Sequence, residues 1–153
     1  MKVKFKHSIK TFSGEVEEMV YGSYRKGKLC IGRDYVYPTL NAHNHQMGAA
    51  CRNLSLVYNR ADSLYRDNFK MYSRQTGLKP GFPDHKLVPS GFALFMKMMY
   101  AWRDSDPTHV DLATVTIADI VALDAEVRTV ARAVDAGFLP TVAGYAAMTG
   151  DIQ

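Results

Sequence analysis

Polar and apolar side chains alternate along the first ten residues of the chain. Odd positions from 3 to 9 carry valine, phenylalanine, histidine and isoleucine, and even positions carry lysine or serine. This period of two is typical of a strand with one buried face, so we expect a strand over residues 2–10. Two further strands are predicted over 16–24 and 28–37, and Gly27 between them can adopt the positive φ of a tight turn. The chain is therefore expected to begin with a three-stranded antiparallel meander.

A long amphipathic helix is predicted over residues 42–75. Pro38 ends the last strand because it has no amide proton for the ladder, and Thr39 or Asn41 can then cap the helix. Apolar side chains recur at spacings of three and four, namely Met47, Ala50, Leu54, Val57, Ala61 and Leu64. The opposite face is basic and carries Arg52, Arg60, Arg66, Lys70 and Arg74. We expect the meander to pack on this helix.

A loop and a second, strongly apolar helix follow. Residues 76–91 hold three of the six prolines and three glycines, which disfavour regular structure. Ser90 can cap a helix over 92–102 that has almost no polar side. We expect that helix to be covered by the core or by a partner.

The C-terminal part is predicted to be helical as well. Thr116 can cap a further helical segment, and Gly137 can end it. Residues 141–153 show no pattern that assigns them a structure or a role. The expected fold class is therefore α+β, with an N-terminal meander, a long helix and a small helical region.

Length and composition indicate one globular domain. At 153 residues and 47% hydrophobic content, the chain is expected to form a single domain over 1–153. It has no apolar run near the roughly 20 residues of a membrane span, and the first ten residues lack a signal-peptide core. We therefore expect a cytoplasmic protein, or a virion-associated one if it is phage-derived, without a membrane partner. Cys30 and Cys51 are expected to be buried and reduced.

Charge is distributed unevenly along the chain. Residues 1–80 carry fourteen Lys and Arg against six Asp and Glu, whereas residues 81–153 carry five against nine. A basic part over 1–75 is thus separated by the 76–91 loop from an acidic part over 92–153. This asymmetry can indicate a polyanion partner, attraction between unlike ends of two copies, or only uneven surface decoration.

Catalytic residue types form only two small groups. His43 and His45 are one residue apart, but no carboxylate or cysteine follows at ligand spacing. Asp84, His85 and Ser90 include the side chains of a hydrolytic triad, but a triad is defined by geometry. The sequence also lacks the phosphate-loop, dinucleotide and zinc-protease motifs. We predict no catalytic residue, no cofactor and no metal, and keep a small enzyme using the loop around His85 as the last alternative.

Basic and aromatic side chains gather in the predicted hairpin. Lysine and arginine neutralise phosphates and tyrosine rings stack on bases, so this segment is expected to contact nucleic acid. The basic face of the long helix could follow the same backbone. The alternative is ordinary packing of strand tyrosines and ordinary solvation of surface charges. The predicted contacts are Arg25, Lys26, Lys28, Arg33, Arg52 and Arg60.

Self-association is predicted from the apolar helix over 92–102. A helix that is apolar on all sides must be surrounded, and a small chain has few elements with which to surround it. Methionine tolerates an imperfect fit, and aromatic residues commonly anchor interfaces. We therefore expect a homo-oligomer with Phe95, Met98, Met99 and Trp102 in its interface.

Residues 12–72 resemble a group of small uncharacterised bacterial and prophage-type proteins. The resemblance lies in the segment Phe12 to Val16, the turn from Arg25 to Lys28, and the segment Pro38 to Asn41 that leads into a helix, together with Tyr21, Tyr24 and Arg33. The glutamine-rich helix start of that group is replaced here by Asn44, His45 and Gln46. The resemblance implies a non-enzymatic, phage-derived structural role.

These patterns favour a non-enzymatic, self-assembling structural protein whose basic N-terminal half contacts nucleic acid. The alternative is a sequence-nonspecific nucleic-acid-binding protein in which that contact is the main function. The biological process, the symmetry of the oligomer and the identity of the polyanion are not encoded in any of these patterns.

Overall fold

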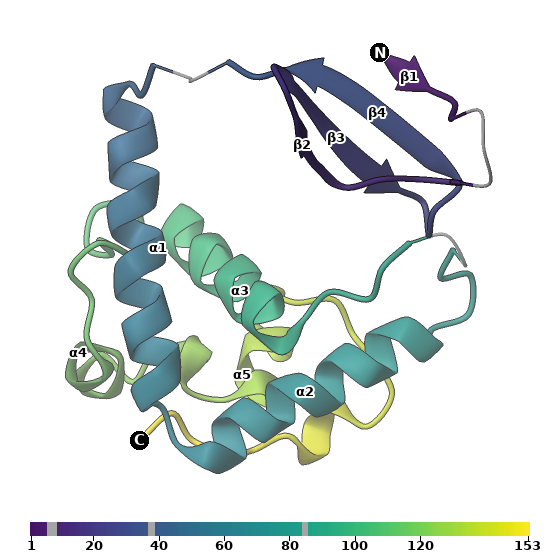
Figure 1. The fold of residues 1–153 in the computed structure, drawn as a ribbon. Helices are drawn as coiled ribbons and strands as arrows, with labels where there is room; N and C mark the ends of the chain where they lie inside the picture. The colour runs from purple at the N-terminus through teal and green to yellow at the C-terminus, as the bar shows by residue number, and fades with distance from the viewer. Residues whose placement is uncertain (6–8, 37–38, 84–85) are drawn as a thin grey trace. The chain divides into compact units, whose positions relative to one another are not determined.

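The computed structural model describes residues 1–5, 9–36, 39–83 and 86–153 (Figure 1). It confirms the α+β class, with an antiparallel sheet near the N-terminus and helices after it. The chain divides into two compact units. The sheet unit comprises Met1–Thr39 with Pro83–Leu87, and the helical unit comprises Leu40–Phe82 with Val88–Gln153. Whether the two units fold as the single domain expected over 1–153 stays a prediction.

The sheet has four strands where three were predicted. The strands are β1 (Lys2–Val3), β2 (Gly14–Val16), β3 (Met19–Tyr24) and β4 (Leu29–Asp34), in the spatial order β1-β4-β3-β2 with antiparallel pairing throughout (Figure 1). The expected strand over 16–24 is in fact the second arm of a tight hairpin, because the chain reverses at Glu17, whose φ is 55°. Val16 therefore pairs with Met19.

The first strand is much shorter than predicted. Its ladder pairs Lys2 with Ile31 and Val3 with Cys30. Because β4 begins at Leu29, the chain beyond Val3 soon runs past the end of its partner strand. Alternation alone therefore predicted a longer strand than the partner can support, and the middle of the expected strand, residues 6–8, lies outside the described residues.

A small aromatic cluster fills one face of the sheet. Tyr21 lies with its ring centroid 5.9 Å from that of Phe5 and 5.9 Å from that of Phe12. Gly32 stands opposite Tyr21 on β4, and a side chain at Gly32 would meet Val3 and Met19 as well as Tyr21. The absence of a Cβ at Gly32 thus lets these apolar side chains meet over the strand.

The predicted long helix is two helices. α1 spans Ala42–Arg60 and α2 spans Ser63–Leu78. Ala61 between them has an extended backbone, and the Asp62 carboxylate accepts a hydrogen bond of 2.7 Å from the Leu64 N–H as the N-cap of α2. An N-cap satisfies an amide that a continuous helix would bond to its own carbonyls, so it marks a helix start. The chain can therefore turn at this point, and both helices bury a face in one core.

Two of the remaining helices follow caps that the sequence predicted. α3 (Gly91–Ser105) is capped by Ser90 and α4 (Ile117–Ala122) by Thr116. A 3₁₀ turn, η1 (Glu126–Arg128), α5 (Val130–Asp135) and a second 3₁₀ turn, η2 (Tyr145–Ala147), complete the helical unit. The predicted C-terminal helix is interrupted near Asp124, whose φ is 45°.

The core of the helical unit is built around aromatic side chains from three helices. Phe95 of α3 is fully buried between Tyr58 of α1 and Phe69 of α2, with ring centroids 5.1 Å and 5.8 Å away. The Tyr65 hydroxyl, also fully buried, donates a 2.8 Å hydrogen bond to the carbonyl oxygen of Val127. Burial disfavours the charged phenolate and raises the pKa of Tyr65 well above its ordinary value.

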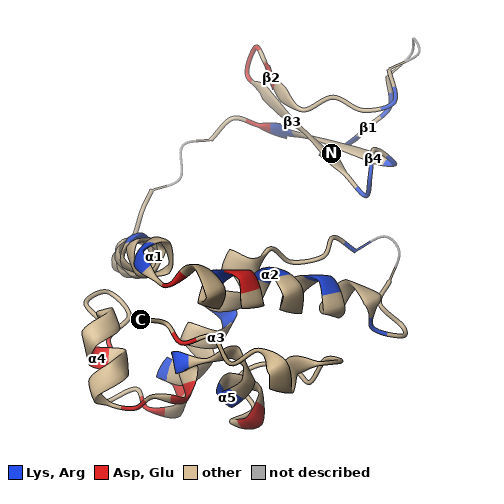
Figure 2. Cartoon of the chain, turned by 90° about the horizontal axis from the view of Figure 1, so that it is seen from below, with Lys and Arg blue, Asp and Glu red and all other residues tan. Residues whose placement is uncertain are grey.

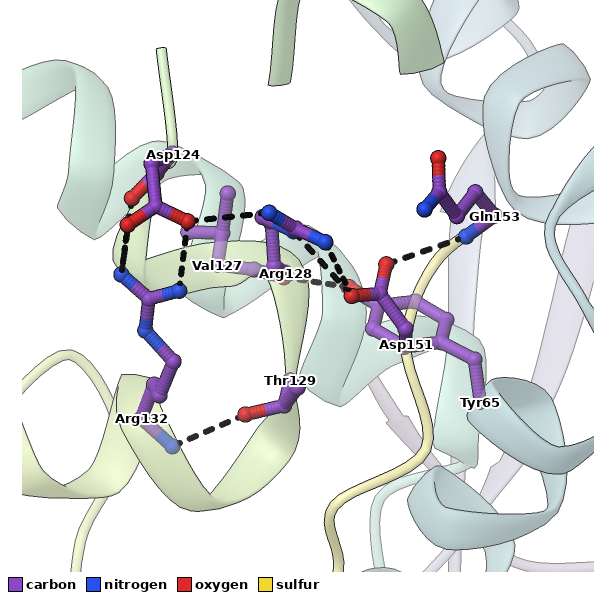
Figure 3. Close-up of polar contacts among 8 residues, drawn as sticks. All are labelled: Tyr65, Asp124, Val127, Arg128, Thr129, Arg132, Asp151 and Gln153. Carbon is purple, nitrogen blue, oxygen red and sulfur yellow. Dashed lines mark hydrogen bonds and ion pairs between the residues drawn. The ribbon is translucent and has the colours of Figure 1, made fainter. Parts of the chain in front are cut away.

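The C-terminal segment, which has no sequence pattern, closes the helical unit. Met148 and Ile152 are buried, and the Asp62 N–H donates to the Ile152 carbonyl oxygen at 3.2 Å. Arg128 connects this segment to the rest of the unit, since it bonds Asp151 at 2.5 Å and Asp124 at 2.9 Å (Figure 3). Residues 148–153 therefore pack against the helical unit and contribute Met148 and Ile152 to its core.

Candidate polyanion-binding site

The two ends of the sheet carry opposite charge. Glu17 and Glu18 occupy the β2–β3 turn, and Asp34 lies beside them at the end of β4, where it pairs with Met19. The β3–β4 turn at the other end holds the basic residues 25–28. In Figure 2 the ribbon is red, for acidic residues, at the turn beside β2, and blue segments, for basic residues, lie near β1 and β4. An anion approaching the sheet unit is thus attracted to one end of it.

Four of the lysines that the structure describes line a single hollow at the basic end. We call it the lysine hollow; it has a volume of about 530 Å³ and lies between β1 and the turn into β4. All four lysines are exposed, and none of the described residues that line the hollow is acidic. Apolar side chains, including Val3 and Leu29, form part of its wall. The four lysines are Lys2, Lys4, Lys10 and Lys28.

The turn from Arg25 to Lys28 places Lys28 at the hollow. Arg25, Lys26 and Gly27 have φ values of 54°, 55° and 80°, and the Lys28 N–H donates to the Arg25 carbonyl oxygen at 3.3 Å. Gly27 adopts a left-handed backbone without cost, whereas Arg25 and Lys26 bear steric strain there. Two basic residues are therefore held in a conformation that glycine or asparagine would favour.

The arrangement provides several cations without fixing one small ligand. Lysine side chains carry flexible stems and compact charges, so they act as point charges toward phosphate oxygens. Four like charges around one hollow repel one another, and an anion that enters relieves this repulsion. The geometry is suited to anion attraction over a surface and shows no rigid cage.

Only some of the sequence-predicted contacts come together here. Lys28 lines the hollow, and Arg25 and Lys26 lie in the adjoining turn. Arg33 is elsewhere on the sheet: it pairs with Val20, and its guanidinium donates to the Tyr24 hydroxyl at 2.9 Å. The last two predicted contacts, Arg52 and Arg60, are exposed on α1 of the helical unit and form no part of the hollow.

Sequence reasoning missed three of the four lysines of the hollow. Lys2, Lys4 and Lys10 were assigned to the wet face of a strand, and nothing local connects them with the turn near Lys28. What places them at the hollow is a contact between distant segments: β1 pairs with β4, and this pairing brings the N-terminus beside the β3–β4 turn. Only that pairing turns an ordinary lysine-rich segment into one side of a site.

The predicted interface residues are covered by their own chain. Phe95, Met98 and Met99 are fully buried, and Trp102 is 5% exposed, all within the core of the helical unit. The premise that the chain has too few elements to surround this helix is wrong, because α1, α2 and η1 all contact α3. The exposed positions of α3, such as Lys97, are few. Self-association stays a prediction, and a surface for it must be sought elsewhere.

The structure gives no support to the two groups of residues considered as a metal site or a hydrolytic triad. His43 and His45 are both exposed in the first turn of α1, and no cluster of three or more metal-ligating side chains occurs among the described residues. Asp84 and His85 lie outside the residues that the structure describes, while the Ser90 hydroxyl accepts from the Ala93 N–H as a helix cap. Cys51, expected to be buried, is exposed, whereas Cys30 is buried.

The Arg–Asp cluster of the helical unit is structural. Asp124 bonds both Arg128 and Arg132, each at 2.9 Å (Figure 3). Hydrogen bonds from Arg132 and then Arg128 lower the pKa of Asp124 below its ordinary value. Each guanidinium already bonds a carboxylate, so the cluster fastens segments of the chain together and presents no open cation to a ligand.

No helix in the described parts of the chain combines the length and apolarity needed to cross a membrane. Comparison with known proteins adds no relative: no family model matches the chain, and neither a curated protein nor a solved structure is significantly similar to it.

Proposed function

We propose that this chain is a non-enzymatic protein that binds nucleic acid without sequence specificity through the basic end of its sheet. The observation that carries the proposal is the lysine hollow, in which Lys2, Lys4, Lys10 and Lys28 line one cavity whose other described lining residues include no acidic side chain. Arg25 and Lys26 in the adjoining turn extend the positive surface.

A polymeric anion suits this surface better than a small one. All four lysines are exposed, so a single phosphate bound there would keep most of its contact with water. A polynucleotide instead offers several phosphates at once, and their neutralisation releases condensed counterions, which favours binding at low salt. Lysine contacts to phosphate carry no sequence information, so the expected binding is nonspecific.

The experiment is a salt series with a matched pair of double variants. Binding of a fluorescent DNA duplex is measured by anisotropy for wild type and for Lys10→Gln/Lys28→Gln. The control is Lys79→Gln/Lys97→Gln, which removes the same charge from exposed positions of the helical unit. We expect affinity to fall with salt, with a log-log slope of about −0.9 per phosphate neutralised, and the hollow variant to weaken binding and flatten the slope.

The control variant should bind nearly as well as wild type, because it leaves the basic end of the sheet intact. Equal losses in both double variants would mean that only net charge matters and that the hollow is no site. Absence of binding at low salt would remove the nucleic-acid function itself.

Self-association is the second part of the proposal, as expected of a structural protein of the kind that residues 12–72 resemble. It is favoured by one observation, a row of three large, exposed apolar side chains on α2. Cytoplasmic or virion-associated location belongs to the same proposal. The catalytic alternative receives no such support: Asp84 and His85 lie outside the described residues, and the Ser90 hydroxyl caps α3.

A further inference from the structure

Three large apolar side chains form a stripe along the exposed side of α2. Leu64, Met71 and Leu78 are 59%, 53% and 75% exposed. They are spaced by seven residues, and a heptad step on an α-helix returns to within about 20° of the starting direction. The α2 stripe therefore runs along one line for about 20 Å at a rise of 1.5 Å per residue. This spacing is typical of the seam along which two helices pack.

Charged residues lie along only one side of the stripe. Asp67 and Arg74 are both exposed and also seven residues apart, so they share a direction on the helix next to the stripe. Asp67 forms an exposed ion pair with Lys70 at 2.7 Å in the single chain. Hydrogen bonding to Lys70 lowers the pKa of Asp67, so this carboxylate is charged at neutral pH. This side of α2 thus presents a negative group, Asp67, and a positive group, Arg74, at different positions along the helix axis.

This pattern is self-complementary in an antiparallel pair. A two-fold axis through Met71 places Leu64 of one copy level with Leu78 of the other, since both lie seven residues from the centre. The same axis also brings the Asp67–Arg74 side of one helix next to the same side of the other. Along the helix axis, Asp67 of one copy then lies about 1.5 Å, the rise of one residue, from the position of Arg74 in the other copy. A parallel pair would instead place unlike flanks together, and neither Asp67 nor Arg74 would then lie beside an opposite charge on the other copy.

A groove at the end of the stripe can receive the partner's leucine. Next to Leu78, a groove of about 390 Å³ is lined mostly by apolar surface, including Pro80, Val142 and Ala143. In the antiparallel pair the Leu64 side chain of the second copy points at this end of α2. The groove and its symmetry copy then enclose both ends of the stripe.

We propose that α2 is a homodimer interface, in which the α2 stripes of two copies pack antiparallel about a two-fold axis through Met71. The proposal rests on the self-association included in the proposed function and assigns it a surface other than α3. An isologous contact of this kind is closed, so it gives dimers and no filaments.

Light scattering on wild type and on a variant with a charge introduced into the α2 stripe tests whether this stripe is the dimer interface. Wild type should have dimer mass at tens of micromolar, and Met71→Glu should reduce it to monomer mass with unchanged circular dichroism. The matched control is Leu123→Glu, an apolar position of similar exposure at the C-terminal cap of α4, which should stay dimeric. A monomeric wild type overturns both this inference and self-association, whereas a Met71→Glu variant that stays dimeric overturns only the α2 surface. Neither result alters the DNA-binding measurement.

Charge reversal and crosslinking test the antiparallel direction. Asp67→Arg and Arg74→Asp should each weaken the dimer, and the double reversal should restore it. In a Cys51→Ser background, a short bis-maleimide should join Leu64→Cys protein to Leu78→Cys protein when the two are mixed. It should not join Leu64→Cys protein to itself. Crosslinking of the Leu64→Cys protein alone would show a parallel pair and overturn the proposal.

Discussion

Gly150 lies so close to α2 that the C-terminal segment has no room for a side chain at this position. A Cβ at Gly150 would stand 2.7 Å from the Asn68 Nδ2 atom and 3.1 Å from the backbone carbon of Leu64. Asn68 is itself buried, so it cannot swing into solvent. We predict that Gly150→Ala lowers the free energy of unfolding by about 1–3 kcal/mol, the usual cost of overpacking a core. Urea denaturation followed by circular dichroism measures it.

Gly48→Ala is the matched control for that substitution. Gly48 lies inside α1, and a Cβ there would meet no atom within 4 Å. Alanine favours helix over glycine by about 0.5–1 kcal/mol, so the same chemical change should stabilise the protein. A Gly150→Ala variant as stable as wild type would mean that the C-terminal segment moves freely away from α2.

Helix caps and turns, which depend on a few adjacent residues, were the features of the fold that the sequence predicted best. Ser90 and Thr116 were expected as helix caps, and Asn41 was one of two candidates for the first cap. Each of the three accepts a hydrogen bond from the amide three residues later. Gly27 was expected in a turn and has positive φ. Cap and turn chemistry needs only a few adjacent residues, so a short stretch of sequence contains all of it.

At the level of elements, the errors came from contacts between distant segments. The apolar period continues across Ala61, so periodicity alone predicts one helix, although Asp62 begins a new one. Continuing the period across the break also counted Leu64 as a core residue, whereas it is exposed. The lysine hollow depends in the same way on the pairing of β1 with β4, which lie more than twenty residues apart. No local pattern specifies where such partners meet.

Tyr72 ties α2 to the chain after α5, and this tie should depend on pH. Its hydroxyl donates to the carbonyl oxygen of Pro140, and burial raises the pKa of Tyr72 from 10.0 to about 12. Because the folded-state pKa is the higher one, the stability from this group is complete below pH 10 and is lost as pH rises toward 12. We predict that Tyr72→Phe costs about 0.5–1.5 kcal/mol at pH 7 and progressively less above pH 10.

Chemical denaturation of both proteins at a series of pH values measures this difference. Wild type should lose stability above pH 10 more steeply than Tyr72→Phe, because the variant has no phenol to ionise at this position. Parallel stability curves across the alkaline range would contradict the assignment. A loss confined to neutral pH in both proteins would point to another titrating group.

The whole molecule consists of two compact units with cores of very different size. The helical unit buries side chains from five helices, including Trp102, whereas the sheet unit holds roughly 40 residues and only a thin aromatic cluster near Tyr21. Domains near this small size bury a low fraction of their surface and are marginally stable. The sheet unit, which carries the lysine hollow, should therefore be the less stable of the two.

Each unit contains its own reporter, so the order of unfolding can be measured in the unmodified protein. Trp102, the only tryptophan, is buried in the helical unit, and Cys30 is buried in the sheet unit, whereas Cys51 is exposed. We predict that one thiol reacts with an aromatic disulfide reagent in the native protein, because Cys51 is accessible and Cys30 is not.

As urea increases, Cys30 should become reactive before tryptophan fluorescence reports loss of the helical core, because the smaller sheet unit opens first. Cys51→Ser leaves Cys30 as the only thiol and identifies the signal. Coincident transitions of thiol reactivity and fluorescence would show instead that the two units unfold as one cooperative structure.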